Sequence, residues 1–470
     1  MISRQQLDRA LNPRTVAVIG DVGRSNYRWL RCMSTFQGKV YSVQIDPKEI
    51  PGIEALGIPN YTSLVDIPDE VDYALVAVPR KVAPIVIADC VKKRVGCAAM
   101  FTSGFAETAT EEGSQLQRRL TQMAREASLV VIGPNCMGLY DPKTGVRFRE
   151  TQATGFEGDV TFLSQSGGHA GDISLAAHAA GVPVRKVISF GNGIVLESAD
   201  YLEYFADDPG TRCIAMYIEG LRDGPRFFQV LRATARRKPV VLWKGGQTAA
   251  GQRATASHTA SLAGSREIWD AMCRQAGAIQ AGSVSEMIDL VKALRVLPPF
   301  TGDGLGVTGG SGGQSVAMAD VFSREGLRVP ALSDATRDQL GAWFSLVGAS
   351  FGNPVDMGSN RREIDAIMDA LVDDPNVDCL VVQVRPPEPD VEDERRFEAQ
   401  IATLERVRGR TTKPVVVVGH SPTPTLDAPA IAALDVRLRA LEIPTFTSYE
   451  RTASVLAKVA AYHRFRAEAG

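Results

Sequence analysis

The stretch Val160-Thr161-Phe162-Leu163-Ser164-Gln165-Ser166-Gly167-Gly168 runs from an apolar, β-branched segment through small residues into a segment of helical periodicity that begins near His169. Strand, glycine-rich turn and helix in this order are typical of parallel sheets that are covered by helices. The pattern recurs at Gly304-Leu305-Gly306-Val307-Thr308, where Gly309 to Gly313 precede a helix expected over residues 314–325. The sequence therefore predicts an α/β fold.

Apolar runs that predict strands fall into three groups along the chain. They cover residues 15–20, 39–43, 73–78, 97–101 and 129–132 in the first group, 159–163, 187–190, 213–218 and 240–243 in the second, and 304–308, 379–383 and 414–419 in the third. A segment rich in charge and glycine (141–158) and the turn Pro298-Pro299-Phe300-Thr301-Gly302-Asp303 separate the groups. We predict three doubly wound parallel-sheet domains, over 1–145, 155–297 and 303–470, of which the last two are flavodoxin-like.

The composition excludes several classes of protein. The chain has 470 residues, more than one hydrophobic core usually serves, with a net charge of −2 and 44% hydrophobic residues. It has no basic run that would bind nucleic acid and no stretch of about eighteen apolar residues that would span a membrane. We expect a cytoplasmic protein without nucleic-acid or membrane partners. The seven cysteines are scattered without a C-x-x-C pair, so we expect reduced, mostly buried thiols and no metal site.

One histidine stands in the loop that follows the strand expected at residues 239–244. His258 is one of five histidines in the chain, and mostly small residues flank it from Ala254 to Gly264. A ring presented in this way suits nucleophilic work, since a neutral imidazole can form a covalent intermediate near neutral pH. The alternative is a solvated loop histidine without a chemical role.

Two glycine-rich turns are candidate phosphate sites. Ser166, Gly167 and Gly168 stand where a helix begins, and the unpaired N–H groups at a helix N-terminus bind anions. Residues 308–313 repeat the arrangement in the third group of strands. The alternative is that these glycines only allow the chain to reverse its direction.

The first strand is followed by Gly20-Asp21-Val22-Gly23, which invites comparison with dinucleotide-binding proteins. The spacing is Gly-x-x-Gly, whereas those proteins use G-x-G-x-x-G, although Asp46 stands where a ribose-binding acid is expected. Lys48 suits a ligand that carries additional phosphates, or else it is an ordinary solvated lysine. The nicotinamide-dinucleotide hypothesis therefore fails in detail.

Several short motifs follow one another along the chain. They are Gly133-Pro134-Asn135-Cys136-Met137-Gly138, Ser164-Gln165-Ser166-Gly167, Ser189-Phe190-Gly191-Asn192, Tyr217-Ile218-Glu219-Gly220, Ser257-His258-Thr259 with Ser261-Leu262-Ala263-Gly264, and Asn353-Pro354-Val355-Asp356. With these motifs the chain resembles, over essentially its whole length, the α subunit of the ADP-forming (NDP-forming) acyl-CoA synthetases in the succinyl-CoA synthetase-like superfamily. The resemblance implies a Rossmann-like coenzyme A-binding domain (1–145), a flavodoxin-like ligase domain with a phosphohistidine loop (155–297) and a second flavodoxin-like domain (303–470).

The resemblance also implies roles for individual residues. His258 would be transiently phosphorylated, and Glu219 would orient its ring through the nitrogen that does not react. Ser166, Gly167 and Gly168 would hold the phosphate. Coenzyme A contacts are implied for Gly20, Ser25, Lys48, Pro79, Thr102, Ser103, Asn135 and Cys136, without a chemical role for the thiol. His169 departs from the family pattern, because small apolar residues are common at its position. At a helix start it is either a second phosphate contact or an ordinary helix residue.

The implied activity is that of an acid–CoA ligase (ADP-forming). It interconverts acyl-CoA, ADP and phosphate with acid, CoA and ATP through an acyl phosphate and phosphorylated His258. ATP or ADP and Mg²⁺ would bind to an ATP-grasp β subunit in an α2β2 hetero-oligomer, and the substrate would be a small carboxylic acid. Two alternatives remain open: an ATP-independent carbamoyl or acyl transferase subunit of the same fold, and a non-catalytic coenzyme A-binding regulatory subunit.

Overall fold

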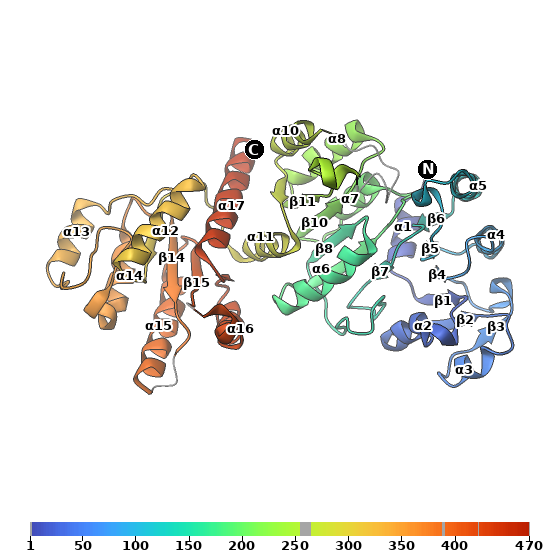
Figure 1. The fold of residues 1–470 in the computed structure, drawn as a ribbon, viewed down its shortest axis with the longest axis horizontal. Coiled ribbons are helices and arrows are strands. Elements are labelled where there is room, and N and C mark those ends of the chain that lie inside the picture. The colour runs from blue at the N-terminus through green and yellow to red at the C-terminus, as the bar shows by residue number, and fades with distance from the viewer. Residues whose placement is uncertain (1, 254–264, 388–390, 422, 470) are drawn as a thin grey trace. The chain divides into compact units, whose positions relative to one another are not determined.

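The computed structural model describes residues 2–253, 265–387, 391–421 and 423–469 (Figure 1). The chain forms two compact units, Met1–Ile288 and Asp289–Gly470. Two six-stranded sheets lie in the first unit and one four-stranded sheet lies in the second. Because each sheet is mainly parallel and helices connect the strands, the predicted α/β fold is confirmed.

The first sheet has six parallel strands in the order β3-β2-β1-β4-β5-β6. Its strands are β1 (Thr15–Ile19), β2 (Lys39–Val43), β3 (Asn60–Tyr61), β4 (Tyr73–Val76), β5 (Cys97–Met100) and β6 (Val130–Ile132). The accompanying helices are α1 (Arg4–Leu11), α2 (Arg28–Cys32), α3 (Ile50–Glu54), α4 (Ala83–Lys93) and α5 (Glu111–Glu126). This is the strand order of a Rossmann fold, which binds ligands beyond the carboxyl ends of its strands.

The second sheet has the order β12-β11-β10-β8-β9-β7. Its strands are β7 (Gly138–Tyr140), β8 (Val160–Ser164), β9 (Val184–Ser189), β10 (Cys213–Ile218), β11 (Val240–Lys244) and β12 (Ile279–Ala281), and its helices include α6 (Gly167–Ala179), α7 (Ser198–Ala206), α8 (Gly224–Ala235), α10 (Arg266–Ala276) and α11 (Val284–Val296). Strand β7 runs antiparallel to β9, so the chain joins the second sheet before residue 145. The three domain limits stay predictions.

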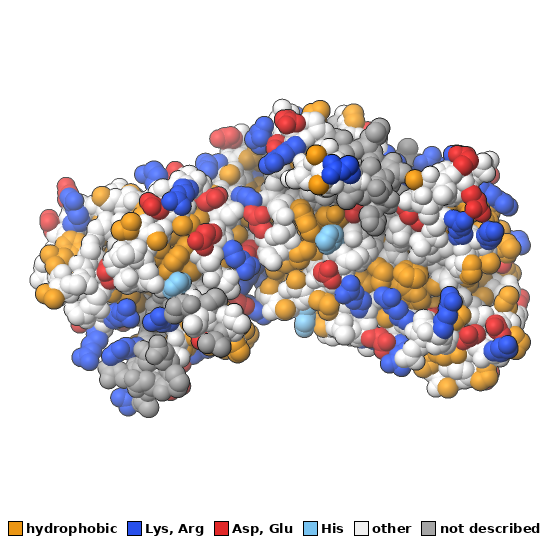
Figure 2. Space-filling view, in the orientation of Figure 1, with side chains coloured by type: hydrophobic (Ala, Val, Ile, Leu, Met, Phe, Trp, Pro, Cys, Tyr) orange, Lys and Arg blue, Asp and Glu red, His pale blue; other side chains and the backbone are white. Residues whose placement is uncertain are grey.

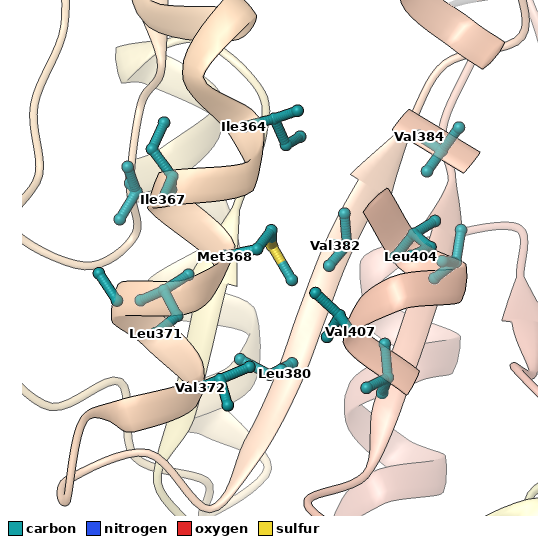
Figure 3. Close-up of a cluster of buried hydrophobic side chains, with 14 of the residues drawn as sticks. Ile364, Ile367, Met368, Leu371, Val372, Leu380, Val382, Val384, Leu404 and Val407 are labelled. Carbon is teal, nitrogen blue, oxygen red and sulfur yellow. The ribbon is translucent and has the colours of Figure 1, made fainter. Parts of the chain in front are cut away.

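The third sheet is parallel, in the order β13-β14-β15-β16. Its strands are β13 (Leu305–Thr308), β14 (Cys379–Val384), β15 (Val415–Gly419) and β16 (Thr445–Phe446), and its helices are α12 (Gly312–Arg324), α13 (Asp334–Gly341), α14 (Ile364–Asp373), α15 (Val391–Arg410), α16 (Pro424–Ala440) and α17 (Tyr449–Ala469). Figure 3 shows the core between α14, β14 and α15. Four buried residues of α14, spaced at i, i+3, i+4 and i+7, give this helix one apolar face: Ile364, Ile367, Met368 and Leu371.

The mixed surface charge and the buried cysteines agree with what the composition predicts. Basic and acidic side chains are interspersed over the face shown in Figure 2. All seven cysteines are buried and unpaired, as predicted. None of the helices in the described ranges has both the length and the apolar character that crossing a bilayer requires.

Candidate functional site

The carboxyl edge of the second sheet brings together most of the predicted phosphate-handling residues. Strands β8, β10 and β11 are neighbours in this sheet, and they end at Ser164, Ile218 and Lys244. Because parallel strands end at the same edge, the loops after them lie side by side. These loops hold Ser166, Glu219 and the chain that leads toward residue 258.

The start of α6 is shaped to leave room in front of its first amides. Ser166 is the N-cap, and its Oγ accepts a hydrogen bond from the His169 amide at 3.3 Å. Met137 closes one side, since a Cβ on Gly167 would lie 3.0 Å from Met137 Cγ. A Cβ on Gly168 would meet only Ser166 Oγ, at 3.8 Å. The first amides of a helix have no acceptor within it, so this turn can bind an anion.

Gln165 fastens the loop after β8 to the loop after β10. Its Oε1 accepts hydrogen bonds from the amides of Glu219 and Gly220, the latter at 3.0 Å, and its Nε2 donates to the Gly220 carbonyl at 3.0 Å. The backbone of Glu219 is therefore held against the loop that starts α6. From the opposite side, the buried Lys244 ammonium donates to the carbonyl oxygens of Glu219, at 2.7 Å, and Gly245, at 2.5 Å.

The Glu219 side chain is held by Tyr217. The Tyr217 hydroxyl donates a hydrogen bond to the Glu219 carboxylate. The pKa of Tyr217 is raised well above its usual value, mainly because the phenol is buried, and further because of the charge of Glu219 and this hydrogen bond. Burial also lowers the pKa of Lys244, and the Glu219 carboxylate partly opposes that shift. Gly245 packs closely against both side chains, because a Cβ on it would lie 2.6 Å from Tyr217 Oη and 3.4 Å from Glu219 Cγ.

The two faces of the second sheet present different side chains at this edge. Trp243 and Lys244 are consecutive strand residues, so their side chains point to opposite faces. On the Lys244 face, α8 and α10 line a pocket of about 530 Å³ with apolar side chains that include Phe228, Trp269 and Met272. The Lys244 ammonium lies 5.9 Å from the centre of the Trp269 ring. Such a pocket can accept an apolar group that carries a negative or polar end.

His258 lies outside the described residues, in the segment 254–264. The described chain continues from the end of β11 at Lys244 to Arg253 and resumes at Ser265, the N-cap of α10. His258 therefore stays a prediction.

The eight predicted coenzyme A residues all follow strands of the first sheet at its carboxyl edge. Gly20 directly follows β1 with φ of +83°, and a Cβ there would lie 2.6 Å from Val78 Cγ1, so this close approach requires glycine. Ser25, Lys48, Pro79 and Ser103 are exposed. Thr102 is buried, and its hydroxyl donates to the Val78 carbonyl at 2.8 Å.

The loop after β1 explains why the dinucleotide motif fails. The buried Asp21 carboxylate accepts hydrogen bonds from the amides of Trp29, at 2.8 Å, and Leu30, at 2.9 Å, in the short helix α2. Ser25 donates to the same carboxylate at 3.1 Å. The helix amides that bind a pyrophosphate in dinucleotide folds are thus occupied by an internal acid.

Asn135 and Cys136 lie in a turn that packs against the second sheet. A Cβ on Gly191 would lie 2.2 Å from the Pro134 carbonyl oxygen, to which the Asn192 amide donates at 3.0 Å. Asn135 has φ of +59°, and the Cys136 thiol is buried with its pKa raised to about 12 by that burial. Two of the motifs noted above therefore join the two sheets, which the sequence did not predict.

Two family models match the chain: a CoA binding domain over residues 14–142 and a succinyl-CoA ligase like flavodoxin domain over residues 157–294. The α subunit of acetate–CoA ligase (ADP-forming) II of Pyrococcus furiosus is 36% identical over 382 residues, which cover 80% of this chain and 81% of that subunit. The chain belongs to the family of ADP-forming acid–CoA ligase α subunits. The predicted family is thereby confirmed.

Two further proteins that are similar to this chain support the assignment. Acetate–CoA ligase (ADP-forming) I of Archaeoglobus fulgidus is 34% identical over 385 residues, and this chain matches 55% of its length. The solved structure of dinucleotide forming acetyl-coenzyme A synthetase 1 of Ca. Korarchaeum cryptofilum, in complex with phosphate and ADP, has a TM-score of 0.83 and 29% identity. The match covers 98% of this chain and 97% of that one.

In this α subunit, the structure adds residues that the sequence did not single out for a role. Gln165, Tyr217 and Lys244 all fix Glu219. Gln165 and Tyr217 lie inside motifs noted above, but only the order of the strands shows that all three residues contact Glu219. In the described ranges, no group of three His, Cys, Asp or Glu side chains is arranged to hold a metal ion.

Proposed function

We propose that this chain is the α subunit of an acid–CoA ligase (ADP-forming). Acyl-CoA, ADP and phosphate would be interconverted with acid, CoA and ATP through an acyl phosphate and a phosphorylated His258. The proposed domains are the coenzyme A domain over 1–145, the phosphohistidine domain over 155–297 and a second flavodoxin-like domain over 303–470. The named relatives favour a ligase over the transferase and regulatory alternatives.

The observation that carries the proposal is the fixed position of Glu219. Its backbone is bound by Gln165 and Lys244, and its carboxylate by Tyr217. A carboxylate held in this way can accept a hydrogen bond from one ring nitrogen of His258. That bond would fix the tautomer and leave the lone pair of the other nitrogen free to attack phosphorus.

The chemistry divides into transfers that share one phosphoryl group. In the direction of thioester synthesis, a carboxylate oxygen of the acid attacks the phosphorus on His258 and the N–P bond breaks, giving an acyl phosphate. The thiolate of coenzyme A then attacks the acyl carbon, the C–O bond breaks and phosphate leaves. Ser166, Gly167 and Gly168 would hold the phosphoryl oxygens with the amides at the start of α6, where the charge develops.

The partners follow from the same scheme. Coenzyme A would bind at the carboxyl edge of the first sheet, with contacts from Gly20, Ser25, Lys48, Pro79, Thr102, Ser103, Asn135 and the Cys136 backbone. ATP or ADP and Mg²⁺ would bind to an ATP-grasp β subunit in an α2β2 assembly. The substrate would be a small carboxylic acid.

Phosphoryl labelling tests this proposal. The chain is mixed with its ATP-grasp partner, Mg²⁺ and ATP that is labelled at the γ-phosphate. We expect label on this chain that is labile in acid, stable in base and absent from His258→Ala, whereas Glu219→Gln slows its appearance. Acyl transfer without ATP would support the transferase alternative, and coenzyme A binding without label or turnover would support the regulatory one.

A further inference from the structure

His169 belongs to a cluster of three aromatic rings at the carboxyl edge of the second sheet. The centre of its ring lies 4.4 Å from that of Tyr217 and 4.6 Å from that of Trp243, and the latter two centres are 4.7 Å apart. Tyr217 and Trp243 are paired residues of β10 and β11. Two neighbouring strands therefore fix the position of an imidazole that stands in the first turn of α6.

The ring nitrogens of His169 have no hydrogen-bond partner within the described part of the chain. Its backbone amide donates a hydrogen bond to Ser166 Oγ. His169 is half-buried, so part of the residue remains accessible to solvent. A neutral imidazole offers one N–H donor and one acceptor. A histidine that served packing alone would not need either group, since a phenyl ring has a similar shape.

The surroundings of the ring indicate a negatively charged ligand. Tyr217 touches His169 with its ring and binds the Glu219 carboxylate with its hydroxyl, so His169 and Glu219 contact the same side chain. The side-chain-free residues Gly167 and Gly168 directly precede His169. An N–H donor beside the free amides of a helix N-terminus adds to their attraction for a phosphoryl group.

We infer that His169 binds the phosphoryl group through a ring N–H, so that the site uses two imidazoles for different tasks. His258 would carry phosphorus, and His169 would hold a non-bridging oxygen while the group rests on the start of α6. This inference rests on the proposed function. It gives a role to the residue at which this chain departs from the small side chain that is common in the family.

Three variants of the chain in complex with its ATP-grasp partner separate this role from packing. His169→Phe keeps a ring between Tyr217 and Trp243 but has no N–H. His169→Gln keeps an N–H donor but has no ring. His178→Phe is the matched control, because His178 lies in the last turn of the same helix, where it stacks on Phe156 with ring centres 6.1 Å apart.

The readouts are the Kd of inorganic phosphate, by calorimetry, and the rate at which labelled ATP phosphorylates His258. A lost hydrogen bond to a charged group predicts that His169→Phe weakens phosphate binding about tenfold or more, that His169→Gln weakens it less, and that His178→Phe stays within about twofold of wild type. The melting temperature of His169→Phe should stay close to that of wild type.

The inference is overturned if the variants rank in the opposite order of phosphate affinity. If His169→Phe binds phosphate as wild type does and labels at the same rate, the ring only packs, and the proposed function stands. If His169→Gln is the weaker binder of the two, packing again explains the residue. If the wild-type pair never labels His258, the proposed function and this inference fail together.

Discussion

The hydroxyl of Tyr217 binds the carboxylate of Glu219 within a single strand end, two residues apart in sequence. Because side chains alternate along a strand, residues two apart project on the same face, and the bond fixes an acid that a free loop would leave mobile. The same tyrosine packs against His169 and Trp243. One side chain thus connects the proposed histidine-orienting acid with the start of α6.

Tyr217→Phe should slow the proposed phosphorylation of His258. The variant keeps the ring contacts and loses only the hydroxyl, and a hydrogen bond to a charged group contributes about 1.5–3 kcal/mol. We expect the labelling rate from γ-labelled ATP to fall about tenfold, while coenzyme A affinity and melting temperature change little. A labelling rate equal to that of wild type would mean that Gln165 and Lys244 are sufficient to position Glu219.

Gly245→Ala should disturb the same contact by steric means. The new Cβ would lie 2.6 Å from Tyr217 Oη, closer than van der Waals contact allows, so the hydroxyl or the loop must move. We expect labelling of His258 to fall about tenfold or more. Gly224→Ala is the control, because a Cβ there meets nothing within 4 Å. Equal activity of the two variants would show that this region tolerates displacement.

Gly20→Ala should destabilise the first unit more than the same substitution at a glycine that has a positive φ but no close neighbour. Gly57→Ala is the reference: its φ is +72° and a Cβ there meets nothing within 4 Å, so it loses only the backbone preference of about 1–2 kcal/mol. At Gly20, with φ of +83°, the new Cβ also meets Val78 Cγ1 at 2.6 Å, which adds about 1–3 kcal/mol of overpacking. Urea unfolding of both variants measures the difference, and equal midpoints would contradict it.

Much of the fold was predictable because its longer strands carry their own signal. The apolar run at Val160 to Ser164, followed by small residues, gives β8 and the start of α6 where the pattern placed them. Among the strands of two or three residues, β6 was predicted from its apolar run, whereas β3, β7, β12 and β16 were not, since they are too short to show a period. Strand β7 additionally depends on β9, a tertiary contact that no local pattern encodes.

The candidate site was predictable only one residue at a time. Ser166 and Glu219 follow separate strands, and the sequence does not state that β8 lies next to β10. Gln165 and Lys244 both form hydrogen bonds with the backbone of Glu219, from the loop after β8 and from the end of β11. Neither contact can be recognised in the sequence unless the order of the strands is known. The Gly-x-x-Gly comparison assigns no role to Asp21, whereas its buried carboxylate accepts hydrogen bonds from the first amides of α2.

The buried cysteines should resist alkylation while the chain is folded. All seven are buried, and burial raises the pKa of Cys90, Cys136 and Cys213 to about 12, far above the usual thiol value. A raised pKa lowers the fraction of thiolate, the reactive form, at every pH below it, so at pH 8 these groups are protonated as well as inaccessible. We expect mass spectrometry to show little iodoacetamide adduct on the native chain and seven adducts after guanidinium unfolding. Rapid modification of native Cys136 would instead show that the turn joining the two sheets opens readily.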